Sequence, residues 1–150
     1  LLFLPAPLVP WVIAALAGTA PNYSLFLGPG GFAMTPLYDI LSAAPAMGTG
    51  AFRHKELRLA MSVGRRRHYR LDQIQPRHFE ETADLSKVPR NILRQAFKDL
   101  VENGLPSIEA VASALPAGFP DRVAAPIINY AKSRITLLKG QFEAGLIGRA

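Results

Sequence analysis

The sequence predicts a mainly α-helical fold with one small β-hairpin. Apolar residues recur at helical spacing through most of the second half of the chain. Nearer the start, glycines and one proline at positions 28–31 separate two short segments of aromatic and aliphatic residues, which is typical of a hairpin. The 13 prolines cut the chain into short pieces, so a long coiled coil is excluded.

The composition sets the class of protein. The chain has 150 residues, so we expect a single lobe over residues 1–150. Hydrophobic residues make up 49% and charged residues 19%, which argues against a disordered tail. Cysteine is absent, which excludes a disulfide framework, a thiolate zinc site and a cysteine nucleophile.

The start of the chain carries no charge before Asp39. Three prolines argue against a membrane-spanning helix, and the apolar run of residues 11–17 is too short to span a bilayer. Residues 15–17 resemble a signal-peptide cleavage site, but the basic segment of a signal peptide is missing, so an exported or membrane-tethered protein is the weaker alternative. For the apolar start at residues 1–20 we favour a buried helix in the core of a larger domain. Residues 1–10 are left open as a non-native or disordered lead-in, and the start at Leu1 leaves open a fragment or a processed product.

A hairpin follows the apolar start. Residues 23–27 and 32–35 are its expected strands, joined by the turn at residues 28–31. We expect a single helical turn over residues 37–42, after the proline that ends the hairpin, and a loop over residues 43–50.

The middle of the chain is less regular. Residues 57–63 are apolar except at Arg58 and Ser62, and they fit either a strand or a short helix. Residues 64–68 predict an exposed loop, and residues 69–71 then pair back as a strand. Pro76 opens a helix, because proline suits the first helical turn.

Three further helices are predicted. The first starts near Pro89, repeats apolar residues every four positions and ends at a left-handed cap formed by Asn103 and Gly104. A short helix covers residues 106–115, and the longest helix opens at Pro120. We interpret these apolar stripes as core and assign them no function.

Few residues offer chemistry. The three histidines, His54, His68 and His78, are not spaced as helical metal ligands. The glycine-rich turn lacks the lysine and the helix start of a phosphate-binding loop. Asn22 precedes the hairpin and Asp39 follows it, which is the relation in which protein kinases hold Mg²⁺ on the phosphates of a nucleotide. Such hard oxygen ligands suit Mg²⁺, which keeps waters and needs few carboxylates.

Several strings of residues resemble HipA-type toxin kinases. The sequence WVIAALAGTAPNYSLFL at 11–27 is similar to the family's catalytic loop, and TPLYDILSA at 35–43 is similar to its metal-binding segment. The strings LRLAMS at 57–62 and PRHF at 76–79, and then the terminal helices, follow in the family's order. The resemblance covers residues 11–145 and implies the helical C-terminal lobe of a protein-kinase-like fold.

The resemblance also implies a function. It identifies the chain as part of a cytoplasmic serine/threonine kinase of a toxin–antitoxin pair, with ATP and Mg²⁺ as cofactors and no membrane association. The implied partners are a HipB-like antitoxin, operator DNA and a protein substrate such as an aminoacyl-tRNA synthetase. The implied Mg²⁺ ligands are Asn22 and Asp39, and the implied nucleotide-binding residues are Asn22, Tyr38 and Asp39.

The catalytic loop departs from the family pattern Asp-Gly-His-Ala-Lys-Asn. Ala17 stands at the position of the catalytic Asp, Thr19 at that of the His and Pro21 at that of the Lys. Alanine cannot accept the proton of a substrate hydroxyl, and loss of a positioned base typically costs about 10²–10⁴ in rate. The N-terminal kinase lobe is also missing from these residues. We therefore expect no catalytic residue and no kinase activity from this chain alone, as in a pseudokinase.

The distribution of charge offers an alternative function. The net charge of +6 arises between positions 53 and 70, where seven cations face one anion, while the other ten cations and ten anions cancel. Arg65, Arg66 and Arg67 could contact DNA phosphates in a non-catalytic module that binds DNA or an antitoxin. The other interpretation of these arginines is a solvated surface loop, which we slightly favour.

Overall fold

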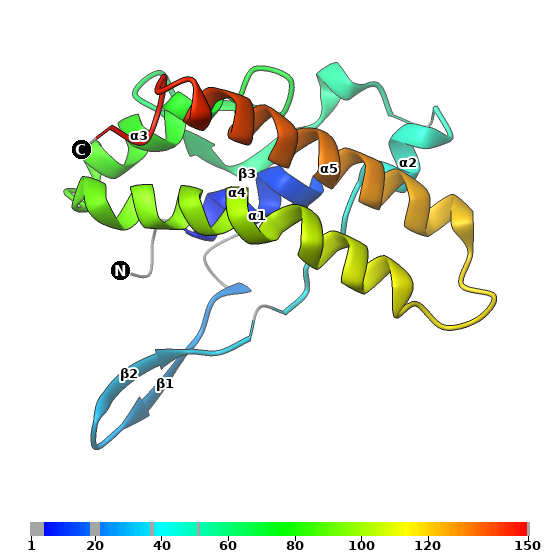
Figure 1. The fold of residues 1–150 in the computed structure, drawn as a ribbon, viewed down its shortest axis with the longest axis horizontal. Coiled ribbons are helices and arrows are strands. Elements are labelled where there is room, and N and C mark those ends of the chain that lie inside the picture. Colours follow the sequence, from blue (N-terminus) through cyan, green and yellow to red (C-terminus); the bar gives the residue numbers. More distant parts are fainter. Residues whose placement is uncertain (1–4, 19–21, 37, 51, 150) are drawn as a thin grey trace.

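The structure is a computed structural model that describes residues 5–18, 22–36, 38–50 and 52–149. It is mainly helical and carries two small antiparallel hairpins, which confirms the predicted fold class at this level. Helices α4 and α5 lie side by side along the length of the molecule, and the first hairpin extends away from them (Figure 1). In chain order the elements are α1 (Pro5–Ile13), β1 (Leu25–Gly28), β2 (Gly31–Met34), α2 (Ala44–Gly48), the 3₁₀ helix η2 (His54–Glu56), β3 (Arg58–Val63), β4 (His68–Arg70), α3 (Pro76–Leu85), α4 (Arg90–Ser113) and α5 (Asp121–Glu143).

Helix α1 lies in the core, as the sequence predicts, but it begins earlier than expected. It spans Pro5–Ile13, so it begins before the unbroken apolar run of residues 11–17, and Leu8 within the supposed lead-in is buried. Prolines are tolerated in a first helical turn because its N–H groups have no partner within the helix. The helix ends where Ala14 adopts a left-handed conformation, with φ of 55°.

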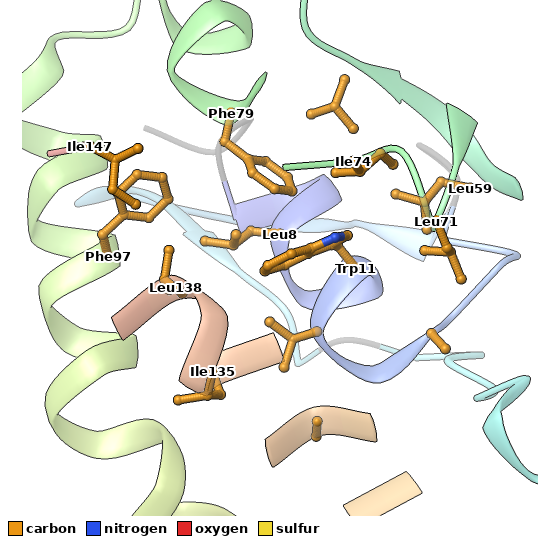
Figure 2. Close-up of a cluster of buried hydrophobic side chains, with 14 of the residues drawn as sticks. Leu8, Trp11, Leu59, Leu71, Ile74, Phe79, Phe97, Ile135, Leu138 and Ile147 are labelled. Atoms are coloured by element: carbon orange, nitrogen blue, oxygen red, sulfur yellow. The ribbon is translucent and has the colours of Figure 1, made fainter. Parts of the chain in front are cut away.

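Trp11 is the centre of the core. Its side chain is 0% exposed and meets the Phe79 ring edge-on, with 5.4 Å between the ring centroids. Figure 2 shows Trp11 among side chains from α1, α3 and the segment before α3. The core thus ties the start of the chain to elements far along the sequence, and it fixes the position of the loop that follows α1.

The first hairpin forms as predicted. Leu25 pairs with Met34 and Gly28 with Gly31, and the two strands are antiparallel. Gly31 has φ of +121°, a conformation that side-chain-bearing residues rarely adopt, so glycine is required at this end of the turn. Every residue of β1 and most of β2 are exposed, so the hairpin stands away from the core.

The second hairpin resolves the ambiguity of residues 57–63 in favour of a strand. Strand β3 pairs with β4, and residues 64–67 form the turn between them. Leu59 and Val63 on β3 are buried against the core. Helix α3 follows and begins at Pro76, as predicted.

Helix α4 contradicts one prediction. The expected stop at Asn103 and Gly104 is absent, and the helix continues through Pro106 to Ser113, so the separate helix over residues 106–115 does not exist. Leu105 and Ile108 beyond the expected stop pack against the core, which favours continuation over the local stop signal. Helix α5 begins after Pro120 as predicted, but it has 23 residues and α4 has 24, so α5 is not the longer one.

Two predictions between the hairpins were also wrong. Tyr38–Ser42 forms no helical turn, and Leu37 lies outside the described residues. Instead, Asp39 adopts a left-handed conformation, and Ser42 forms an isolated antiparallel bridge with Ala15, just after α1. Residues 44–48 form the short helix α2 where we expected only a loop, with Pro45 in its first turn. In the part of the chain that the structure describes, no helix is both long and apolar enough to cross a membrane.

Candidate functional site

The base of the first hairpin brings together the residues that the sequence singled out. Asn22, before β1, is 6% exposed, and its side-chain amide Nδ2 donates to the carbonyl oxygen of Tyr38 at 3.4 Å. The hydroxyls of Ser24 and Tyr38 lie 2.8 Å apart. The Thr35 amide donates to the Ser24 carbonyl at 3.0 Å and extends the pairing of the two strands toward this base. Asn22 is therefore bonded to the residue next to Asp39.

The segment after Asp39 is fastened to the end of α1. The Ser42 hydroxyl donates to the Ile13 carbonyl at 2.5 Å, and the Ala43 amide donates to the Ala14 carbonyl at 2.9 Å. On the other side, the Ala60 amide in β3 donates to the Leu16 carbonyl at 3.0 Å. The chain after α1 thus runs between the segment that follows Asp39 and the second hairpin.

Asp39 is exposed and has a left-handed backbone, with φ of 54°. Aspartate is among the few residue types that adopt this region at modest cost. Within the described residues, no group of three or more His, Asp or Glu side chains could enclose a metal ion. Two oxygen-bearing side chains at the base of a hairpin nevertheless fit Mg²⁺, because this ion retains waters and binds phosphate oxygens. The pair does not suit a metal that needs a cage made of protein ligands alone.

The position of the expected catalytic base holds no functional group. Ala17 is exposed, so a methyl group faces solvent where the family resemblance places a carboxylate. Gly18 after it is buried, and a Cβ atom there would lie 2.6 Å from Cγ of Pro10. Thr19 and Pro21 lie outside the described residues. No proton acceptor is therefore available at position 17 itself.

Two tyrosines lie near the base of the hairpin. Tyr38 is 46% exposed and adjacent to Asp39 in the chain. Burial raises the pKa of the Tyr23 phenol above its ordinary value, so this side chain stays neutral and can donate a hydrogen bond.

The basic turn of residues 64–67 forms a second candidate site. Its backbone is fastened to α3: the Gly64 amide donates to the Thr82 hydroxyl at 2.8 Å and the Arg65 amide donates to the Glu81 carboxylate at 2.8 Å. The Arg65 guanidinium also lies 3.7 Å from the carboxylate of Asp84. Arg66 and Arg67 are exposed and form no ion pair with any residue that the structure describes. The turn of residues 64–67 is thus fixed to α3 through its backbone, and it carries the exposed side chains of Arg66 and Arg67.

Sequence reasoning missed a histidine pair beside this turn. The rings of His68 on β4 and His78 on α3 are stacked, with 4.0 Å between their centroids and 6° between their planes. A spacing of ten residues between a strand and a helix follows no ligand pattern, so only the packing of α3 on the second hairpin reveals the pair.

A separate apolar cavity of about 330 Å³ lies between α1, α4 and α5. Its apolar lining includes Val12, Leu100 and Ile135, and Asp99 and Ser107 are among its polar residues. It contains none of the predicted site residues. No known protein-family model matches the chain.

Proposed function

We propose that this chain is the C-terminal lobe of a HipA-like serine/threonine kinase toxin and that it is inactive by itself. The observation that carries the proposal is the hydrogen bond between the Asn22 side chain and the Tyr38 backbone. It holds the two segments with kinase-like strings together at the base of an exposed hairpin. In this proposal Asn22 and Asp39 hold Mg²⁺, which in turn neutralises the phosphates of ATP.

The first hairpin supports a lobe that works with a second one. Phe26, Leu27 and Phe32 are exposed on it, and the first charge of the chain comes only at Asp39. An isolated two-stranded hairpin is at best marginally stable in water. Its exposed apolar side chains therefore form a surface that is expected to pack against another part of a protein. In the proposed function the cover is the N-terminal kinase lobe.

Phosphate transfer requires a carboxylate at the position of Ala17 and a second lobe over the nucleotide. A kinase positions the substrate hydroxyl with a carboxylate and covers the nucleotide with a second lobe. Ala17 supplies no carboxylate, and a missing base alone lowers the rate by about 10²–10⁴. This chain alone would bind a HipB-like antitoxin only if the antitoxin makes its contacts with residues of this lobe and not with the N-terminal lobe.

The lack of activity is tested by transfer of radiolabelled phosphate from Mg·ATP to the chain itself and to a generic protein substrate. We expect incorporation no higher than in a heat-denatured control, for the wild type and for Ala17→Asp. Incorporation by the wild type above that control would contradict the proposal.

The metal pair is tested with Mn²⁺ in place of Mg²⁺, because Mn²⁺ broadens nearby nuclear magnetic resonances. In the ¹⁵N-labelled chain with ATP, we expect broadening around Asn22 and Asp39 that is lost in Asp39→Asn. Asp121→Asn, at another exposed aspartate, is the matched control and should retain it. Broadening that survives Asp39→Asn would contradict the assignment of Asp39.

A second candidate function rests on the basic turn. We propose as the alternative a non-catalytic module in which Arg66 and Arg67 contact DNA phosphates, since both are exposed and the turn beneath them is fixed. Each phosphate contact releases counterions, so binding weakens as salt rises.

Gel shifts with duplex DNA at several salt concentrations test this alternative. Replacing Arg65, Arg66 and Arg67 with alanine should weaken binding and flatten its dependence on salt. A variant with alanine at Arg94, Arg122 and Arg149, all exposed elsewhere, controls for net charge. Equal effects of the two triple variants would argue against a specific contact at the turn.

A further inference from the structure

We infer that the stacked His68 and His78 rings form a pH-dependent latch. The neutral pair holds the basic turn of residues 64–67 against α3, and uptake of protons by the pair releases the turn. The latch is independent of the kinase-lobe proposal, because none of its groups belongs to the site of Asn22 and Asp39.

The first reason is the stacking itself. Two rings whose centroids are 4.0 Å apart and nearly parallel gain contact when they are neutral. Two imidazolium rings at this distance repel each other, because like charges at close range disfavour the charged form. The parallel planes also direct the ring nitrogens along separate planes instead of toward a common point, so the pair is not arranged as a chelating metal site.

The second reason is a hydrogen bond that only neutral His78 can accept. Its Nδ1 atom accepts the backbone N–H of Gln75 at 3.2 Å, just before α3. This bond places the proton of the neutral ring on Nε2. Protonation of Nδ1 would turn the acceptor into a donor that faces another donor, and the bond would be lost.

The third reason is the position of His78 in the first turn of α3. The unpaired N–H groups at a helix N-terminus carry partial positive charge, which disfavours a cation there. The side chain is also only 3% exposed, so a charge on it loses hydration. Burial first, and then the positive charges of His68 and Arg77, lower the pKa of His78, while the Glu81 carboxylate opposes them.

The latch reaches the basic turn through a short chain of hydrogen bonds. The Thr82 hydroxyl donates to the His78 carbonyl at 2.9 Å and accepts the Gly64 amide at 2.8 Å. The Glu81 carboxylate accepts the Arg65 amide, and the Arg65 side chain faces Asp84. The turn is tight: a Cβ at Gly64 would lie 2.8 Å from Oε2 of Glu81 and 3.1 Å from Cβ of His78. The His68 ring lies 3.4 Å from the same Cβ position through its Cδ2 atom. A shift of His78 or His68 would therefore disturb the backbone of the turn.

The test is backbone hydrogen exchange of the full chain at pH 7 and pH 5, corrected for the intrinsic exchange rates. A process that takes up one proton shifts by up to about tenfold per pH unit. We expect protection of the Gly64 and Arg65 amides to fall about tenfold or more between pH 7 and pH 5. The Val88 amide, which donates to Ala83 at the end of α3, is the internal control and should keep its protection.

Variants separate the latch from general acid sensitivity. His68→Phe combined with His78→Gln removes both histidine rings, while glutamine retains an acceptor for the Gln75 amide. Protection of Gly64 and Arg65 in this double variant should be equal at the two pH values. His54→Phe, at the third histidine, should behave as the wild type does.

Two results would overturn the latch: equal protection of the turn at pH 7 and pH 5 in the wild type, or the full acid-dependent loss in the double variant. If the double variant does not fold, His68→Phe alone decides. This substitution keeps an aromatic ring in the stack and removes one of the two rings that can take up a proton. Its loss of protection should then be smaller than that of the wild type, and an equal loss would overturn the latch.

Discussion

A single absent methyl group sets how closely α4 and α5 approach each other. A Cβ atom at Gly104 on α4 would lie 3.0 Å from Cδ1 and 3.2 Å from both Cγ atoms of Ile135 on α5. Ile135 is buried, so it has little room to move. The glycine is therefore required by packing and not by a turn.

A matched pair of glycine substitutions tests this. Gly140→Ala on α5 meets nothing within 4 Å and should stabilise the protein by about 0.5–1 kcal/mol, because alanine favours a helix. Gly104→Ala gains the same preference but overfills the interface at a cost of about 1–3 kcal/mol, so we expect net destabilisation. Urea unfolding with unchanged m-values measures both. Equal stabilisation by the two substitutions would contradict the close packing.

The elements differ in how much they contribute to the core. Strand β3 buries Leu59 and Val63, whereas all of β1 is exposed. The first hairpin is held mainly by its own pairing and by the contacts at its base. Its apolar side chains therefore contribute little to the stability of the helical body.

Replacing phenylalanine with alanine should lower the free energy of unfolding much more in the core than on the exposed hairpin. Phe97 on α4 is 0% exposed, and Phe97→Ala should lower the free energy of unfolding by about 3–5 kcal/mol. Phe32 on β2 is 75% exposed, and Phe32→Ala should change it by no more than about 0.5 kcal/mol. Thermal or urea unfolding decides, and a large loss in Phe32→Ala would show that the hairpin is covered within this chain.

At the scale of the whole molecule, the lowered pKa of His78 makes the stability depend on pH. Its pKa in the folded state lies below the ordinary value of 6.5. Between the folded-state pKa and about pH 6.5, the His78 side chain therefore holds more protons in the unfolded chain than in the folded one. Its contribution to stability falls as the pH decreases through this window and is constant below the folded-state pKa.

Urea unfolding at pH 5, 6, 7 and 8 tests this direction. We expect the midpoint to be highest at pH 7–8 and to decrease toward pH 5, with a smaller decrease in His78→Gln. The Gln variant keeps an acceptor for the Gln75 amide, so its loss at neutral pH should be modest. A midpoint that is constant or rises on acidification, or one that changes equally in the variant, would contradict the prediction.

The sequence predicts those elements whose signals are local. The glycines at positions 28, 30, 31 and 64 mark the two turns, because glycine adopts backbone conformations that other residues avoid. Pro76 and Pro120 mark the starts of α3 and α5, because proline fixes the backbone and suits a helix start. The same local signals misled at Asn103 and Gly104. There, Leu105 and Ile108 beyond the expected stop pack against the core, and the helix continues despite its stop signal.

For the candidate site, the sequence by itself identified Asn22, Tyr38, Asp39 and the basic turn, because residue type and flanking motifs carry that information. Only the tertiary structure decided that the Asn22 side chain bonds to the residue before Asp39, and that His68 stacks on His78. Asn22 and Tyr38 are 16 residues apart in the sequence, and His68 and His78 are ten residues apart. Neither pair lies within one helix or strand, so no periodic pattern in the sequence reveals the contact. Their positions follow from the core around Trp11, which places α1, the second hairpin and α3 against one another.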